Sequence, residues 1–237
     1  MSGFLATYGW QFPFLVYSIA LFITVATYFF IFEPARKAQT TLNIVEPTTE
    51  KFPTQTVIQI CITTLIASAL YFVYTFQFSL ALDSIGIKDR QQVGNYMAVA
   101  SIAVPIGAVL FKLVSKINIR IQLAMVAFLI GIGLIGIGLA PTVNLVIASA
   151  WIQQLGCGMT MSVLIAWALN SLPFAFRGRG MGFWSSAFFL GQFISPLVVT
   201  VMRNLTGSLL NAFVAFGILC LCLAILNLIL SRKQSFK

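Results

Sequence analysis

Long stretches of apolar sequence without a single charged residue limit what this chain can fold into. Seven such stretches occur, at approximately residues 12–32, 57–82, 93–111, 121–140, 143–172, 181–202 and 208–231. A helix that crosses a membrane needs about 20 consecutive, predominantly apolar residues. Membrane β-strands instead alternate apolar and polar residues over segments of about ten, and these stretches do not. The sequence therefore predicts an all-α fold, a polytopic transmembrane helix bundle with about seven spans.

The composition excludes a water-soluble protein and narrows the possible chemistry. Hydrophobic residues make up 59% of the chain and charged residues 8%, whereas a soluble domain has about 45–50% and about 25%. The chain contains no histidine, which excludes His-ligated zinc and a Ser-His-Asp triad. Since no Asp or Glu lies within the apolar stretches, catalysis inside the membrane lacks a titratable group. We expect neither an enzyme nor a cofactor or metal site.

Lysine and arginine are distributed unevenly between the two sets of connecting segments. When the segments are assigned to alternating sides of the membrane, eleven of the 14 basic residues fall on one side. Only Lys88, Arg90 and Arg203 fall on the other. Cytoplasmic loops carry the excess of basic residues, which places the C-terminus in the cytoplasm and, with seven spans, the N-terminus outside. The net charge of +9 then faces an anionic leaflet, and no long basic run indicates a nucleic-acid partner.

Two local sequences resemble a known transporter family. GWQFPFLVY (residues 9–17) opens the first span, and WALNSLPFAFRGRGMGFWSSAFFLGQFISP (residues 167–196) joins the fifth span to the sixth. They resemble the start of helix six and the helix ten–eleven region of the major facilitator superfamily, particularly its bacterial exporter-like branches. The connection from Gly107 to Arg120 keeps the glycine and the positive charge of that family's loop motif but lacks its acidic residue.

The resemblance implies an organisation for the whole chain, the C-terminal half of a major-facilitator-type fold. Residues 1–32 would hold the last transmembrane helix of a missing N-terminal half, and residues 33–56 the cytoplasmic central linker. Residues 57–231 would form a six-helix transmembrane bundle, helices seven to twelve, followed by a cytoplasmic tail at residues 232–237. The expected location is the bacterial inner membrane.

The same resemblance implies secondary active transport of a small organic solute by alternating access, in the direction of efflux. Its partners would be the lipid bilayer, the solute, and either the missing N-terminal six-helix half or a second copy in a homodimer. The alternative is a truncated, non-transporting membrane protein or a subunit that needs a separate N-terminal half. Because the spans contain no carboxylate, a proton-coupled transporter would carry its titrating group in the missing half.

Polar residues inside the spans are the candidates for solute contact. Thr64, Ser68, Tyr71 and Thr75 recur at the spacing of one helical stripe, with Tyr74 beside them. An interhelical hydrogen bond in a membrane contributes only about 0.6–2 kcal/mol, so a polar side chain there indicates a cavity. The predicted substrate-binding residues are Ser68, Tyr71, Tyr74, Gln154 and Gln192. The alternative is that hydroxyl groups bond to carbonyls of their own helix.

Small residues inside the spans predict close helix packing. GIGLIG (residues 131–136) matches a dinucleotide-binding fingerprint, but that motif needs a preceding strand and a later acidic residue. Asp89 is the last acidic residue of the chain, so we interpret the glycines at 131, 133, 136 and 138 as sites where a neighbouring helix approaches closely. Gly182, Ser186 and Ser195 predict tight packing of the sixth span, and Pro196 a kink; the alternative is that this helix contacts the substrate directly.

Overall fold

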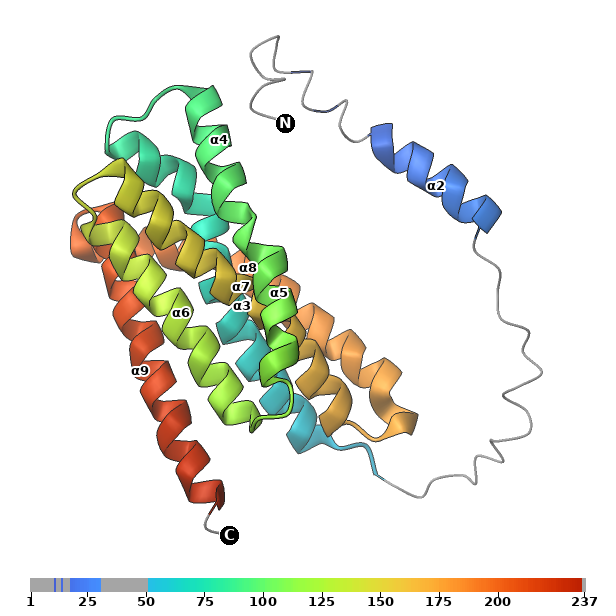
Figure 1. Ribbon diagram of the computed structural model, residues 1–237. Coiled ribbons are helices and arrows are strands. Elements are labelled where there is room, and N and C mark those ends of the chain that lie inside the picture. The colour runs from blue at the N-terminus through green and yellow to red at the C-terminus, as the bar shows by residue number, and fades with distance from the viewer. Residues whose placement is uncertain (1–10, 12–13, 15–17, 31–50, 236–237) are drawn as a thin grey trace. The chain divides into compact units, whose positions relative to one another are not determined.

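The structure, a computed structural model, describes residues 11, 14, 18–30 and 51–235 (Figure 1). Its contacts divide the chain into two units, residues 1–52 with 89–94 and residues 53–88 with 95–237. In the first unit, helix α2 (Ser18–Phe30) lies within the expected first span. The flanks of that span at residues 12–13, 15–17 and 31–32 lie outside the described residues, as do residues 33–50 of the expected linker.

Long apolar helices follow one another from residue 54 onward. They are α3 (Thr54–Ser84), α4 (Arg90–Ser101), α5 (Ala103–Val114), α6 (Ile119–Leu139), α7 (Val143–Ser171), α8 (Arg177–Thr206) and α9 (Leu209–Ser235). With α4 and α5 taken together, six helices of the described residues are long and apolar enough to cross a membrane. The expected all-α transmembrane bundle is confirmed, and the protein is an integral membrane protein.

Most helices extend beyond their predicted ends, and α8 and α9 extend farthest. Helix α8 begins at Arg177, not at residue 181, so Arg177 and Arg179 belong to its first turn and not to a loop. Helix α9 continues to Ser235, past the predicted end at residue 231. Both extensions consist of charged, polar and glycine residues that continue a helix beyond its apolar stretch, and a criterion based on hydropathy does not detect them.

The third expected span is divided at Ile102 into α4 and α5. Pro105 has no backbone N–H and cannot donate to the carbonyl of Ser101 as a helix requires. The N–H of Ile102 instead donates to the carbonyl of Val99, at 3.3 Å, which is the tighter three-residue pattern of a 3₁₀ turn. The break therefore follows from the proline one turn later.

The glycines of α6 lie on two faces, each against a different helix. A Cβ on Gly131 would lie 2.9 Å from the carbonyl oxygen of Gly217 on α9, and a Cβ on Gly138 would lie 2.6 Å from that of Leu210. On the other face, a Cβ on Gly133 would lie 2.6 Å from the backbone nitrogen of Gln153 on α7. Such short distances leave no room for a side chain. The prediction of close helix approach at these glycines is confirmed.

Helix α8 packs against α3 through residues in its second half. A Cβ on Gly191 would lie 2.6 Å from the carbonyl oxygen of Leu65, and Ser195 is fully buried. Gly182, by contrast, has nothing within 4 Å of a Cβ position, and Ser186 is exposed. The prediction of tight packing is therefore correct for Ser195 and wrong for Gly182 and Ser186, which face away from the bundle.

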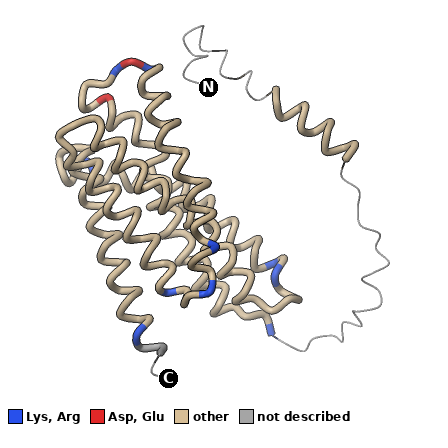
Figure 2. Tube along the Cα trace, viewed as in Figure 1, with Lys and Arg blue, Asp and Glu red and all other residues tan. Residues whose placement is uncertain are grey.

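Basic residues of the second unit gather at one end of the bundle. Figure 2 shows them where α5, α7 and α9 end and α6 and α8 begin. The residues that define this basic end are Lys112, Lys116, Arg120, Arg177, Arg179 and Arg232. Asp83, Lys88 and Arg203 lie at the opposite end, because α3 and α8 run from the basic end to the other. The charge asymmetry expected from the sequence is thus present along the bundle.

Candidate functional site

The predicted residue Ser68 lies in the contact between α3 and α8. Its hydroxyl donates to the carbonyl of Phe188 on α8. Two turns farther along α8, the hydroxyl of Ser195 donates to the carbonyl of Ala69 on α3, at 2.8 Å. Both serines are fully buried. Ser68 therefore bonds neither to its own helix nor into open space, and in this conformation its hydroxyl joins two helices.

The two predicted tyrosines of α3 differ in exposure. Tyr71 is half-buried, with its ring centroid 6.2 Å from that of Phe188. Tyr74 is 1% exposed, and its ring stacks on Phe78 at 4.4 Å. The Tyr74 hydroxyl has no hydrogen-bond partner among the described residues. A buried polar group without a partner costs about 1–3 kcal/mol, so this hydroxyl is available to a partner that reaches it.

Helix α7 contributes an amide and a thiol next to α3. The Gln153 side-chain nitrogen donates to the Cys157 sulfur at 3.1 Å, and that thiol is 3.9 Å from the carbonyl oxygen of Tyr71, to which it donates. The Gln153 side-chain oxygen has no partner within the part of the chain that the structure describes. Sequence reasoning selected the neighbouring Gln154, which is also buried, at 8% exposure.

Gln192 lies on α8, one helical turn after Phe188, and is half-buried. The structure thus brings Ser68 and Tyr71 of α3 against Phe188, with Gln192 on the adjacent turn. The described contacts do not join Gln154 to these residues. Tyr71 and Gln192 are the half-buried members of the predicted set, and Ser68, Tyr74 and Gln154 are buried.

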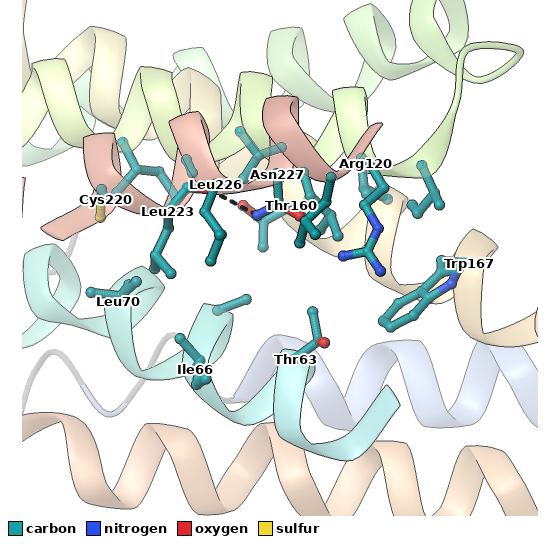
Figure 3. Close-up of a pocket in the computed structure, with 18 of the residues that line it drawn as sticks. Thr63, Ile66, Leu70, Arg120, Thr160, Trp167, Cys220, Leu223, Leu226 and Asn227 are labelled. Atoms are coloured by element: carbon teal, nitrogen blue, oxygen red, sulfur yellow. Dashed lines mark hydrogen bonds between the residues drawn. The ribbon is translucent and has the colours of Figure 1, made fainter. Parts of the chain in front are cut away.

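A pocket of about 530 Å³ lies between α3 and the group formed by α6, α7 and α9, toward the basic end (Figure 3). The predicted substrate-binding residues do not line it. Its polar lining residues are Gln59, Thr63, Arg120, Thr160, Trp167 and Asn227. The pocket exists because α3 packs mainly on α8, while α6 packs on α7 and α9, with few contacts between the two groups.

Sequence reasoning missed this pocket, although a signal was present. Gln59, Thr63 and Leu70 recur at helical spacing on one face of α3, parallel to the stripe of Thr64 and Ser68 that was chosen. The sequence pattern places Arg120 in a connecting segment. It lies instead in the first turn of α6, where its side chain reaches the pocket.

Comparisons with known proteins identify the fold. No protein-family model and no curated protein sequence matches the chain. Among solved structures it is similar to a POT family transporter crystallised in complex with a thioalcohol-conjugated peptide, with a TM-score of 0.59 and 18% sequence identity. The likeness is one of fold. It covers 92% of this chain and 53% of that transporter, so the chain spans about half of its length.

Proposed function

We propose that the bundle is one half of a secondary transporter that moves a small organic solute by alternating access. The observation that carries the proposal is the extent of the likeness, which includes nearly all of this chain and about half of the transporter it resembles. Secondary transporters bind solute near the membrane midplane between two bundles that rock against each other. A second bundle, from an N-terminal half or from a second copy, completes the site.

The chain is proposed to be the C-terminal half, oriented with its basic end in the cytoplasm. The charge asymmetry supports this orientation, because six basic residues define that end, while Lys88 and Arg203 lie with Asp83 at the other. The sequence resemblance to exporter-like members supports the assignment to the C-terminal half, the bacterial inner membrane and the direction of efflux.

The proposed solute contacts are Tyr71 and Gln192 and, less directly, Ser68, Tyr74 and Gln154. Tyr71 and Gln192 are half-buried in the bundle, so a second bundle could enclose a solute against them. The other three residues are buried and become accessible only if helices move. Since all five are uncharged, they suit a neutral or amphipathic solute.

Proton coupling, if present, is proposed to depend on the second bundle. Asp83 is the single acidic residue among residues 53–88 and 95–237, and it lies in the last turn of α3, at the end of the membrane span. A carboxylate at that position is outside the middle of the membrane, where proton carriers of transporters are placed.

Solute flux in proteoliposomes tests the proposal. This chain alone is compared with a version extended to twelve helices by an N-terminal six-helix bundle, against a panel of neutral and amphipathic solutes. We expect flux of at least one solute only with the second bundle present, and a proton gradient to drive it only there. Absence of flux from both versions would favour the non-transporting alternative, and equal flux by monomers of the chain alone would contradict the half-transporter proposal.

A further inference from the structure

The pocket between α3, α6, α7 and α9 has an apolar floor. Each of the four helices contributes one buried residue to this floor, at most 8% exposed: Leu70, Ile130, Val163 and Cys220. Thr160 lies among them, but its hydroxyl already donates to the carbonyl of its own helix at Gly156, at 2.8 Å. The floor therefore offers apolar surface and no free polar group to an occupant.

The mouth of the pocket is polar and carries a positive charge. Gln59 is exposed, and Arg120, Trp167 and Asn227 are half-buried. Gln59 precedes Leu70 on α3, and Arg120 precedes Ile130 on α6, each by about ten residues or about 15 Å along the helix. The polarity thus changes along the depth of the pocket, from a charged mouth at the basic end to an apolar floor.

Arg120 supplies the charge of the mouth. Figure 3 shows its guanidinium extending into the space between α6 and α3, beside Trp167. The sole acidic residue of this unit, Asp83, is about 30 Å from Thr63 along α3, so it does not neutralise Arg120. Asn227 is already engaged, because its side-chain nitrogen donates to the carbonyl of Leu223 at 2.8 Å. The guanidinium is the group that an anion would meet.

Exposed apolar residues beside the mouth of the pocket indicate that the mouth lies at the depth of the boundary between lipid chains and headgroups. Ile62 on α3 and Leu226 on α9 line the pocket and are 57% and 50% exposed. Where such a surface is not covered by a second bundle, large exposed apolar side chains of a membrane helix face hydrocarbon. The turns beyond them hold Gln59 and Arg120 and reach the region of the headgroups. An amphiphile can therefore enter this pocket from the bilayer.

We propose that the pocket binds an anionic phospholipid from the leaflet at the basic end. The phosphate oxygens accept hydrogen bonds from the Arg120 guanidinium, whose planar fork matches a phosphate, and an acyl chain lies against the floor. The volume of about 530 Å³ is within the range of about 300–1,000 Å³ that holds drug-sized ligands, so it admits one acyl chain, with the headgroup at the mouth beside Arg120. Lipid binding needs no transport, so it can be tested apart from the proposed function.

Native mass spectrometry of the full chain, purified in detergent and titrated with lipid, tests this site. The probes are phosphatidylglycerol, phosphatidylcholine and, as the soluble headgroup, glycerol phosphate. The variants are Arg120→Gln, which removes the charge, and Ala127→Phe, which fills the pocket. Lys116→Gln is the matched control, because Lys116 is exposed at the same end and outside the pocket. Size-exclusion profiles and melting temperatures verify that each variant is folded.

We expect phosphatidylglycerol to bind about tenfold more tightly than phosphatidylcholine, because both lipids offer a phosphate to Arg120 but the cationic choline of phosphatidylcholine offsets the attraction. Arg120→Gln should abolish this preference, Ala127→Phe should weaken both lipids, and Lys116→Gln should change neither. An equal loss of the preference for phosphatidylglycerol in Lys116→Gln would overturn the proposal, because it would indicate that diffuse surface charge attracts the lipid. Full competition by glycerol phosphate would overturn it as well, since a soluble anion would then be the ligand. Unaltered lipid binding to Ala127→Phe would also overturn it, because the lipid would then bind outside the pocket.

Discussion

Gly107 of α5 and Gly158 of α7 face each other where the two helices cross. A Cβ on Gly107 would collide with the carbonyl of Leu155 and lie 3.2 Å from the Cα of Gly158. A Cβ on Gly158 would in turn collide with the carbonyl of Val104. The two backbones are therefore in direct contact, as small residues allow in membrane helices.

The first prediction concerns this crossing. Gly107→Ala should lower the free energy of unfolding by about 1–3 kcal/mol, the usual range for overpacking, because the obstacle is backbone and cannot rotate away. Gly182→Ala is the matched control, since a Cβ there meets nothing within 4 Å. It should be neutral or stabilise by up to about 1 kcal/mol through helix propensity. Melting in detergent measures both, and equal effects would show that the crossing is looser than described.

The second prediction concerns the bond from the Ser195 hydroxyl to the carbonyl of Ala69. Ser195→Ala should destabilise the bundle by about 0.6–1.7 kcal/mol, the range found for interhelical hydrogen bonds in membranes. Ser186→Ala on the same helix should have no effect, because the Ser186 hydroxyl bonds only to its own helix at Gly182. Denaturation in mixed micelles distinguishes the two variants. A larger loss of stability in Ser186→Ala than in Ser195→Ala would contradict the interhelical role of Ser195.

Most of the helices can be predicted from the sequence, since each apolar stretch has the length of a membrane span. The glycines of α6 can be predicted as well: Gly131 and Gly138 fall on one face of the helix and Gly133 and Gly136 on the opposite face, so neighbours on both sides can approach closely. These features depend on composition and spacing along one helix. They need no knowledge of which helix is adjacent.

The candidate site cannot be predicted in the same way, because it depends on which helices are adjacent and how each is rotated about its axis. Gly182 and Gly191 look equivalent in the sequence, yet only Gly191 faces α3, because the rotation of α8 about its axis decides between them. Ser68 was predicted to contact solute or its own helix, whereas its partner is Phe188, 120 residues later. The place of Arg120 in the pocket depends on a gap between α3 and α6, and the spacing of Gln59, Thr63 and Leu70 on α3 does not show which helix lies across that gap.

The third prediction concerns orientation. In a version whose four native cysteines are replaced by alanine, single cysteines are introduced as Lys116→Cys, Arg232→Cys and Lys88→Cys. A membrane-impermeant maleimide should label the first two from the cytoplasmic side and the third from the outside, because Lys88 lies at the end of the bundle opposite the other two. Labelling of Lys116→Cys and Arg232→Cys from different sides would refute the topology.

The fourth prediction concerns solute contact in the twelve-helix version. Gln192→Ala should raise KM by about two- to tenfold with little change in expression, because a hydrogen bond from an amide contributes about 0.5–1.5 kcal/mol. Gln55→Ala is the control, since Gln55 is exposed in the first turn of α3 and far along the helix from Tyr71. Initial uptake rates over a range of solute concentrations measure both. Unchanged kinetics in Gln192→Ala would remove that residue from the proposed site.

The glycine contacts also set how the bundle can deform. In the described part of the chain, glycines bring α5 into close contact with α7, α7 with α6, and α6 with α9. A separate glycine brings α8 into close contact with α3. Backbones that touch at such points resist sliding, since closely packed interfaces move between discrete arrangements. We therefore expect any deformation of the bundle to move α3 and α8 together relative to the other four helices, so that the space beside Arg120 widens or narrows. A lipid bound in that space would favour the arrangement in which the helices are farther apart, so that membrane composition would bias the position of α3 and α8.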